Sequence, residues 1–146
     1  MTIKACKIHE ITGKTVIAED SGFEFDYLNG EPGIYSKRYL LSSPFEDKIN
    51  IILTRMKDAT KPEQRGMTFK GSVVCITSNK TLIHQDFSLS GFCAYEPHGV
   101  SATDYDRIMY LPNYAKTVAE LLSSQRYKIN PRIEAIRQVY KSLREV

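Results

Sequence analysis

The segment KTVIAEDSGFEFDYLNGEPGIYSKRY, residues 14–39, carries the clearest structural signals in the chain. Its apolar, β-branched run at 15–18 predicts a short buried strand. Two carboxylates, Glu19 and Asp20, follow this run, and we expect them to end the strand just before a Ser-Gly turn. In open α/β sheets ligands bind beyond the ends of the strands, because the loops leaving the strands form a crevice there. The acid pair is therefore the first candidate site in the chain.

The residue types around the acid pair suit a metal ion and an anion. Glu19 and Asp20 could hold a hard divalent cation such as Mg²⁺. Lys37 and Arg38 follow a second predicted strand at 23–28 and a glycine-rich turn, and they could meet an anion that the metal also touches. Asp-Ser-Gly is also ordinary turn chemistry, so a purely structural role for the acids is the alternative.

Helices and two further strands are predicted outside this segment. Residues 3–11 predict a helix with Ala5, Ile8 and Ile11 on its buried arc and Gly13 at its end. A second predicted helix starts at Ser43, with a core face of Phe45, Ile49, Ile52 and Met56. A surface loop at 58–66 and a hairpin of strands 67–77 and 81–90 follow it.

Two helices are predicted near the C-terminus. A short helix at 117–122 begins with a capping box of Thr117 and Glu120. The final helix is capped by Asn130, and its apolar stripe consists of Ile133, Ile136, Tyr140 and Leu143.

The composition indicates one globular domain over residues 1–146, with 42% hydrophobic and 25% charged residues. No apolar run is long enough to span a membrane, and the N-terminus lacks a signal-peptide pattern, so we expect a cytoplasmic protein. The three cysteines have no paired spacing, which fits free thiols in a reducing compartment. The net charge of +3 does not require a nucleic-acid partner, since no basic run with interleaved aromatic residues occurs; it equally suits a polyanionic small molecule.

Three strings in the opening segment resemble the signature of a known enzyme family. They are AEDSG at 18–22, LNGEPGIYS at 28–36 and RY at 38–39, and weaker matches continue in the same order into the last helix. The signature is that of the inosine triphosphate pyrophosphatases. The resemblance implies an α/β fold, with a mixed twisted sheet flanked by helices, and Mg²⁺ as cofactor. It also implies hydrolysis of non-standard purine nucleoside triphosphates, of the inosine and xanthosine type, to monophosphate and pyrophosphate.

The resemblance assigns roles to residues that lie far apart in the sequence. Asp20 would position or deprotonate the attacking water, and Glu19 and Asp20 would hold the metal. Arg132 would donate to the six-keto oxygen of the purine, favouring inosine or xanthosine over adenosine. Lys4, Lys116 and Arg126 would offset charge on the phosphates. The remaining residues with an implied role in substrate binding are Ser21, Tyr105 and Asp106.

Two positions depart from the family pattern. Residues 103–106 read Thr-Asp-Tyr-Asp where the family has Phe-Gly-Tyr-Asp, so the ring that stacks on the purine is replaced. Residues 130–132 read Asn-Pro-Arg where the family has Ser-His-Arg, so the arginine is kept and the histidine is not. Tyr105 could equally be a core aromatic residue, and Lys4 a solvated helix lysine.

The family also has a strand and loop ahead of the matching region, with a phosphate-binding motif and a metal-binding glutamate that we do not find in this sequence. We therefore expect a fold that lacks the family's first strand and loop. Either another chain supplies these groups, or the site works differently, or catalysis has been lost. The last option makes a catalytically impaired nucleotide-binding or assembly relative the alternative function. Because an exposed sheet edge encourages pairing, we expect a homodimer.

Overall fold

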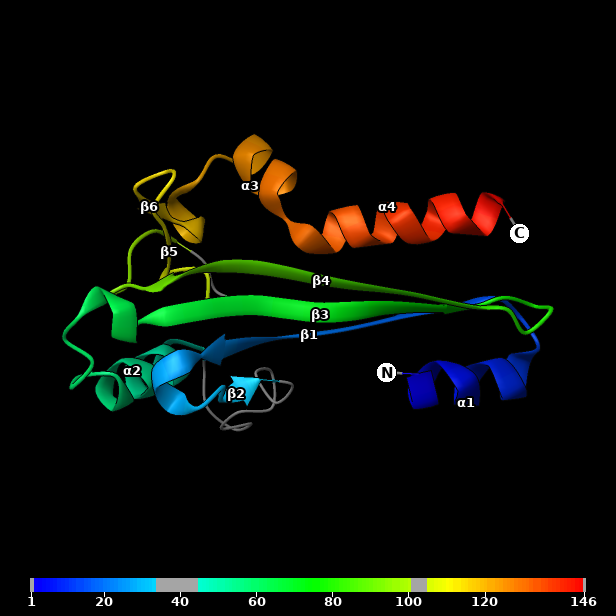
Figure 1. Ribbon diagram of the computed structural model, residues 1–146, viewed down its shortest axis with the longest axis horizontal. Helices are drawn as coiled ribbons and strands as arrows, with labels where there is room; N and C mark the ends of the chain where they lie inside the picture. The colour runs from blue at the N-terminus through cyan, green and yellow to red at the C-terminus, as the bar shows by residue number, and fades with distance from the viewer. Residues whose placement is uncertain (1, 34–44, 101–104, 146) are drawn as a thin grey trace. The chain divides into compact units, whose positions relative to one another are not determined.

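The computed structural model describes residues 2–33, 45–100 and 105–145 (Figure 1). The chain divides into two compact units, which we call unit 1 and unit 2. Unit 1 consists of Met1–Ser21, Lys70–Ser88 and Asn130–Val146, and unit 2 consists of Gly22–Phe69 and Leu89–Ile129. Three long strands pass through both units, and each unit has a hydrophobic cluster of its own.

The chain combines one sheet with helices, so the predicted α/β class is confirmed. The elements are α1 (Thr2–Thr12), β1 (Val16–Phe25), β2 (Pro32–Gly33), α2 (Phe45–Arg55), β3 (Gly66–Ile76), β4 (Leu82–Cys93), β5 (Met109–Leu111), β6 (Lys116–Thr117), α3 (Ser123–Ile129) and α4 (Pro131–Arg144). Short 3-10 helices lie at Asp26–Leu28, Pro62–Gln64 and Val118–Glu120. Lys37, Arg38 and the Ser43 cap of the predicted helix fall outside the described residues. In the described part of the chain no helix has the length and apolar character needed to cross a membrane.

Strand β1 runs without a break through Glu19, Asp20, Ser21 and Gly22, so the predicted turn after the acid pair is wrong. Strand β3 lies beside β1 in the sheet, and the two backbones come close at Gly71, where an added Cβ would stand 2.1 Å from the Asp20 carbonyl oxygen. Strand pairing therefore overrides the local turn preference of Ser-Gly. The turn comes later, in the glycine-rich stretch predicted after the strand at 23–28, where Asn29 and Gly30 both have positive φ.

The sheet is antiparallel rather than mixed. In unit 2 its described strands have the order β2-β1-β3-β4-β5-β6, with Phe23 opposite Gly33 and Cys93 opposite Met109. In unit 1 the parts of β1, β3 and β4 lie side by side in that order. The predicted hairpin of β3 and β4 is confirmed, and its turn is closed by a hydrogen bond from the Thr77 amide to the Thr81 carbonyl, 2.9 Å.

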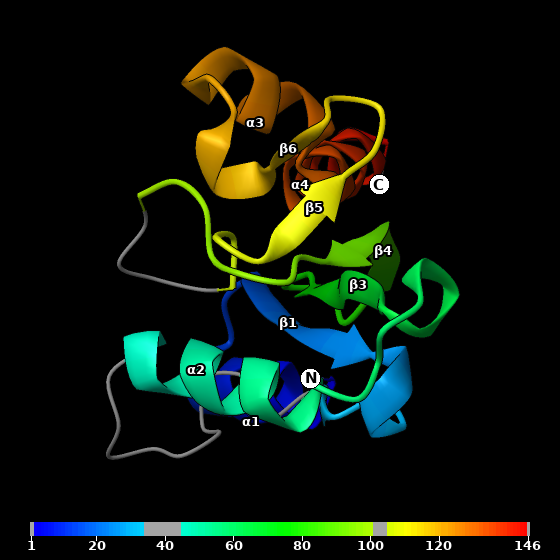
Figure 2. The same cartoon turned by 90° about the vertical axis from the view of Figure 1, so that its left-hand side faces the viewer.

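Unit 1 has α1 and α4 on opposite faces of its strands (Figure 1, Figure 2). On the α1 face, Ala5 packs with Ala18 of β1 and with two residues of β3. The predicted arc of α1 is wrong beyond Ala5, because Ile8 is 42% and Ile11 is 76% exposed. The second buried position is His9, whose Nδ1 lies 2.7 Å from the Lys14 carbonyl oxygen. Small and polar residues cover this face, which apolar periodicity alone does not predict.

Helix α4 begins where the sequence predicts. The Asn130 side chain caps it by accepting a hydrogen bond from the Arg132 amide, 3.0 Å, and Pro131 occupies the first turn. The buried positions are Ala135 and Val139. These two residues lie beside members of the predicted stripe and do not belong to it. Tyr140, a predicted member of the stripe, is 47% exposed.

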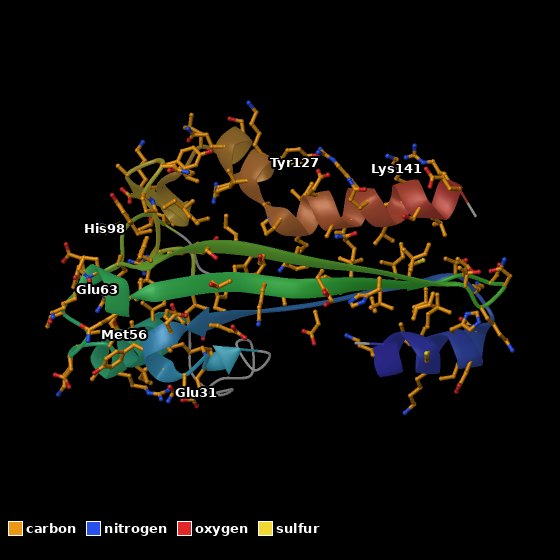
Figure 3. The ribbon with its side chains drawn as sticks, in the orientation of Figure 1. Glu31, Met56, Glu63, His98, Tyr127 and Lys141 are labelled. Atoms are coloured by element: carbon orange, nitrogen blue, oxygen red, sulfur yellow. The ribbon has the colours of Figure 1, made fainter. Side chains whose placement is uncertain are left out.

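Unit 2 has the larger core. The predicted face of α2 is confirmed at Ile49, Ile52 and Met56, which are buried in this core. The side chain of Phe45, also predicted for this face, lies outside the described part of the structure. Of the residues labelled in Figure 3, Met56 is fully buried, whereas Glu31 and Glu63 are exposed. This core also holds aromatic side chains from β1.

Candidate functional site

The residues predicted to form the site divide between the two units. Those in unit 1 are Lys4, Glu19, Asp20, Ser21 and Arg132. Those in unit 2 are Tyr105, Asp106, Lys116 and Arg126. Each group has a local geometry of its own.

In unit 1 the structure brings together Glu19, Ser21 and Arg132. The Arg132 Nε lies 3.0 Å from Glu19 Oε1, and Arg132 Nη2 donates a 2.8 Å hydrogen bond to Ser21 Oγ. The Nε and Oε1 atoms are both buried, and their contact is an ion pair. The Asn130 cap fixes the start of α4 and so places Arg132 in its first turn, beside β1. The guanidinium is therefore held by a carboxylate and a hydroxyl from one strand.

The two acids of the pair point to opposite faces of β1. Successive side chains on a strand alternate between its faces. Ala18 packs on the α1 face, and Glu19 and Ser21 contact Arg132 of α4, so Asp20 belongs to the α1 face. Asp20 is exposed there, and its Oδ1 accepts a hydrogen bond from the Ser21 amide, 3.1 Å. The continuous strand thus separates two carboxylates that a turn would have left together.

Lys4 is exposed on α1 and directly precedes the buried Ala5. The helix that carries it lies on the same face of β1 as Asp20 (Figure 2). A basic and an acidic side chain are therefore available on this face of unit 1.

In unit 2, Tyr105 belongs to the core. It is fully buried, with its ring centroid 5.3 Å from that of Phe23 and 6.2 Å from that of Phe25. This matches the core interpretation of Tyr105 more closely than a contact with a base. The neighbouring Asp106 is partly buried, and its carbonyl oxygen accepts a hydrogen bond from the Ala119 amide, 3.1 Å.

The two predicted phosphate-binding cations of unit 2 lie on different elements. Lys116 is exposed on β6, opposite Leu111 of β5. Arg126 is partly exposed on α3, where its Nη2 lies 3.5 Å from Ser123 Oγ.

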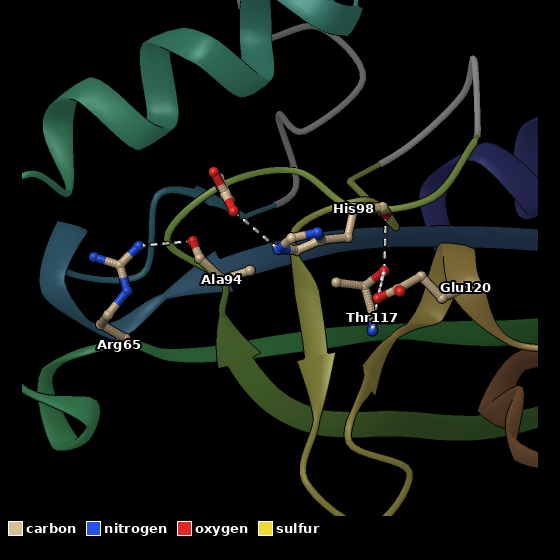
Figure 4. A network of polar contacts seen from close by, with 6 residues as sticks. Arg65, Ala94, His98, Thr117 and Glu120 are labelled. Atoms are coloured by element: carbon tan, nitrogen blue, oxygen red, sulfur yellow. Dashed lines mark hydrogen bonds and ion pairs between the residues drawn. The ribbon is translucent and has the colours of Figure 1, made fainter.

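The predicted capping box of Thr117 and Glu120 is confirmed, although it begins a 3-10 helix (Figure 4). The Thr117 amide donates to Glu120 Oε1 at 2.9 Å, and Thr117 Oγ1 donates to the His98 carbonyl at 2.9 Å. The backbone hydrogen bond from Thr117 lowers the pKa of the Glu120 carboxyl. These bonds fix the loop that contains His98 against β6.

Sequence reasoning missed Arg65, which lies in the stretch expected to be a surface loop. Its side chain is only 3% exposed. Nε and Nη2 donate to the carbonyls of Cys93 and Ala94 at 2.8 Å, and Nη1 donates to two carbonyls that follow α2. Nothing in the polar composition of residues 58–66 distinguishes this arginine from a solvated one.

A cavity of about 670 Å³ lies beside Arg65 within unit 2. Its walls combine aromatic side chains with acids and a histidine. They are formed by Pro62, Arg65, Phe92, Cys93, Ala94, Tyr95, Glu96, His98, Tyr110, Pro112, Ala115 and Glu120. None of the predicted site residues is among the residues that line it.

Cys93 should be nearly inert toward alkylating reagents. Burial raises the pKa of its thiol to about 11, and the nearby Arg65 charge offsets only part of this rise. At pH 8 only about 0.1% of such a thiol is the reactive thiolate. Iodoacetamide followed by peptide mass mapping should therefore modify the partly exposed Cys6 and leave Cys93 unmodified.

The raised pKa of Cys93 also gives the sign of a pH effect. Because the folded protein holds this proton more tightly than the unfolded chain, the associated stability is complete below pH 9. It is lost as the pH rises from 9 through about 11. Alkylation of Cys93 at pH 8 at the rate of Cys6 would show that the thiol is accessible and contradict this prediction.

Comparison with known proteins gives a consistent result. The sequence matches the model of the Ham1 family over residues 1–142. A dITP/XTP pyrophosphatase of Dictyoglomus thermophilum is 38% identical over 133 residues, which is 91% of this chain and 65% of that protein. A dITP/XTP pyrophosphatase of Bacillus licheniformis is 35% identical over 139 residues, which is 94% of this chain and 70% of that protein. This chain therefore spans about two thirds of the length of these relatives.

The fold comparison agrees. The solved structure of the Staphylococcus aureus Ham1 protein has a TM-score of 0.88 and 32% sequence identity to this chain. The match covers 99% of this chain and 74% of that one.

Proposed function

Since the chain belongs to the Ham1 family, we propose that it hydrolyses non-standard purine nucleoside triphosphates to the monophosphate and pyrophosphate. The resemblance noted at residues 18–39 is confirmed at the level of the family. The relatives that carry the name dITP/XTP pyrophosphatase support inosine and xanthosine bases as the substrate class. The single structural observation that supports the proposal best is the guanidinium of Arg132, held beside β1 by Glu19 and Ser21.

Asp20 is the proposed catalytic base. Its carboxylate is exposed, so a water molecule can reach it. A positioned carboxylate can orient such a water and accept its proton during attack on a phosphorus atom. Lys4, on the helix that covers the same face of β1, would offset negative charge on the phosphates. For Lys116 and Arg126 of unit 2 we propose, separately, the phosphate-binding role that the resemblance implies.

Arg132 is the proposed reader of the base, from the opposite face of β1 to Asp20. A nucleotide that meets both residues would pass the edge of β1, which β2 pairs only at Phe23 and Glu24 in the described residues. A guanidinium is a donor only, so it can pair with the six-keto oxygen of hypoxanthine or xanthine. It cannot pair with the six-amino group of adenine, which is also a donor. For unit 2 we propose, separately, that Asp106 contacts the nucleotide, whereas the buried ring of Tyr105 packs against Phe23 and Phe25 in the core.

We propose Mg²⁺ as the cofactor. Among the residues that the structure describes, no cluster of three or more His, Cys, Asp or Glu side chains could hold a metal by itself. Magnesium is commonly bound by one or two carboxylates together with substrate phosphates, and the exposed Asp20 suits such a site. When bound, the ion would offset phosphate charge during cleavage. Glu19 fits less well as a ligand, because its carboxylate contacts Arg132.

Purified protein should release pyrophosphate from dITP and XTP in the presence of Mg²⁺. We expect kcat/KM for dITP to exceed that for dATP by at least about a hundredfold, since the six-amino group of dATP is itself a donor and cannot accept a hydrogen bond from Arg132. Coupled detection of pyrophosphate measures both rates. Binding of dITP in calorimetry without any pyrophosphate release would instead favour the impaired nucleotide-binding relative.

We further propose a cytoplasmic homodimer. Within the described residues Cys6, Cys75 and Cys93 are free thiols, which suits a reducing compartment. Sedimentation velocity at micromolar concentration tests the assembly, and a single monomeric species would contradict it.

A further inference from the structure

The contact between Arg132 and β1 is built from two residues of one face. Residues two apart on a strand point to the same side and lie about 7 Å apart. Glu19 and Ser21 have this spacing, and they contact Nε and Nη2 of a single guanidinium. Two contacts on different nitrogens fix both the position and the plane of the group. All three residues belong to unit 1.

Partial burial strengthens this ion pair relative to the exposed pair of Arg137 and Glu134 on the same helix. The side chains of Arg132 and Glu19 are 28% and 26% exposed, and their charged atoms lie 3.0 Å apart. On the same helix, Arg137 and Glu134 are 57% and 61% exposed and 3.7 Å apart. An exposed pair contributes little because water screens it, whereas a partly buried pair is screened less. Glu134 therefore offers a matched control for Glu19.

The same geometry disfavours a metal ion at Glu19. A divalent cation bound to its Oε1 would stand next to the permanent positive charge of Arg132. Like charges at this separation repel, and the repulsion grows as the site is buried. Asp20 points to the other face of β1, so it does not relieve this repulsion.

We propose that Glu19 and Ser21 are positioning residues for Arg132, which set the preference for the base, and that Glu19 is not a metal ligand. This inference rests on the proposed function, because it takes Arg132 as the group that reads the six-keto oxygen. Glu19 fixes the guanidinium by charge, and Ser21 fixes its rotation by accepting a hydrogen bond. The metal requirement belongs to the Asp20 face.

Glu19→Gln keeps the shape of the side chain and removes its charge. We expect the ratio of kcat/KM for dITP to that for dATP to fall at least tenfold, mainly through a higher KM for dITP. The Mg²⁺ concentration for half-maximal activity should stay the same. Ser21→Ala should lower the ratio by a smaller factor, and Glu134→Gln should leave it unchanged. A rise in the Mg²⁺ requirement of Glu19→Gln with an unchanged base preference would make Glu19 a metal ligand and overturn the proposal.

A double-variant cycle separates positioning from a general effect on the fold. Arg132→Met should abolish the preference for dITP, and adding Glu19→Gln to it should change the preference no further. Additive losses would show that Glu19 acts independently of Arg132. Thermal unfolding of each variant verifies that the protein remains folded at the assay temperature.

Binding without metal distinguishes failure of this inference from failure of the proposed function. Calorimetry with inosine monophosphate and adenosine monophosphate needs no turnover. If the unsubstituted protein hydrolyses no triphosphate, the proposed hydrolase is refuted. If Glu19→Gln then binds inosine monophosphate more weakly than the unsubstituted protein does, the positioning role is still supported. Equal affinity of the unsubstituted protein for both monophosphates would remove Arg132 as the reader and refute the positioning role, even if dITP is hydrolysed.

Discussion

Asp20→Asn should lower kcat for dITP hydrolysis by about a thousandfold, within the range expected for loss of a general base. Asparagine has the same size as aspartate, but its neutral amide cannot accept a proton from water. The hydrogen bond from the Ser21 amide ends on Asp20 Oδ1, and the asparagine oxygen can accept it equally well. Since Asp20 is exposed, the substitution should leave the fold and its stability unchanged. Pyrophosphate release under saturating dITP measures the effect.

Asp26→Asn is the control for this prediction. Asp26 is also exposed and follows the same strand in the chain, but it lies in unit 2 and has no proposed role. It should retain the activity of the unsubstituted protein. If Asp20→Asn kept more than about a tenth of the activity, proton transfer to Asp20 could not be a major part of the mechanism.

The structure confirms those predictions in which one residue type satisfies one local requirement of the backbone. Asn130 caps α4 because its side chain accepts from an amide that has no partner within the helix. Gly13 ends α1 at φ 66°, a conformation that costs glycine little. The buried face of α2 follows from the period of the helix alone. Each of these predictions needs no knowledge of the rest of the fold.

The errors arose where a distant segment decided the outcome. The Ser-Gly pair after Asp20 favours a turn, yet pairing with β3 beside Gly71 keeps β1 extended. This one error changed the predicted site, because acids at a turn can share a ligand, whereas adjacent residues on a strand face opposite ways. The metal role expected for Glu19 came partly from that turn and partly from the family resemblance. Its contact with Arg132 joins residues more than a hundred positions apart, so local pattern could not show it.

Arg65→Met should destabilise the protein by about 3–5 kcal/mol, the largest stability effect that we expect from a single substitution. The buried guanidinium donates to four backbone carbonyls, those of Met56, Ala59, Cys93 and Ala94. It also lies over the Tyr95 ring, 4.3 Å from the centroid. Methionine fills similar space but has no donor, so all four carbonyls would lose their charged donor. Met56 O would keep the Ala59 amide at 3.0 Å, and Ala94 O would keep the Cys93 thiol at 3.4 Å. Hydrogen bonds to a charged group are the strong ones, and the loss of several in a buried place is the reason for the size of the effect.

Urea unfolding of the whole chain, with linear extrapolation to water, measures this loss. Arg65→Lys should recover only part of it, because an ammonium group keeps the charge but cannot reach carbonyls on both sides as a planar guanidinium does. Arg55→Met is the matched control. Arg55 pairs with Glu31 at 2.8 Å, but the two side chains are 37% and 60% exposed, so its removal should cost about 1 kcal/mol or less. Equal losses for the two methionine variants would mean that water replaces the donors of Arg65. In that case α2 would be held to the ends of β3 and β4 by apolar packing in the unit 2 core, with no contribution from the arginine.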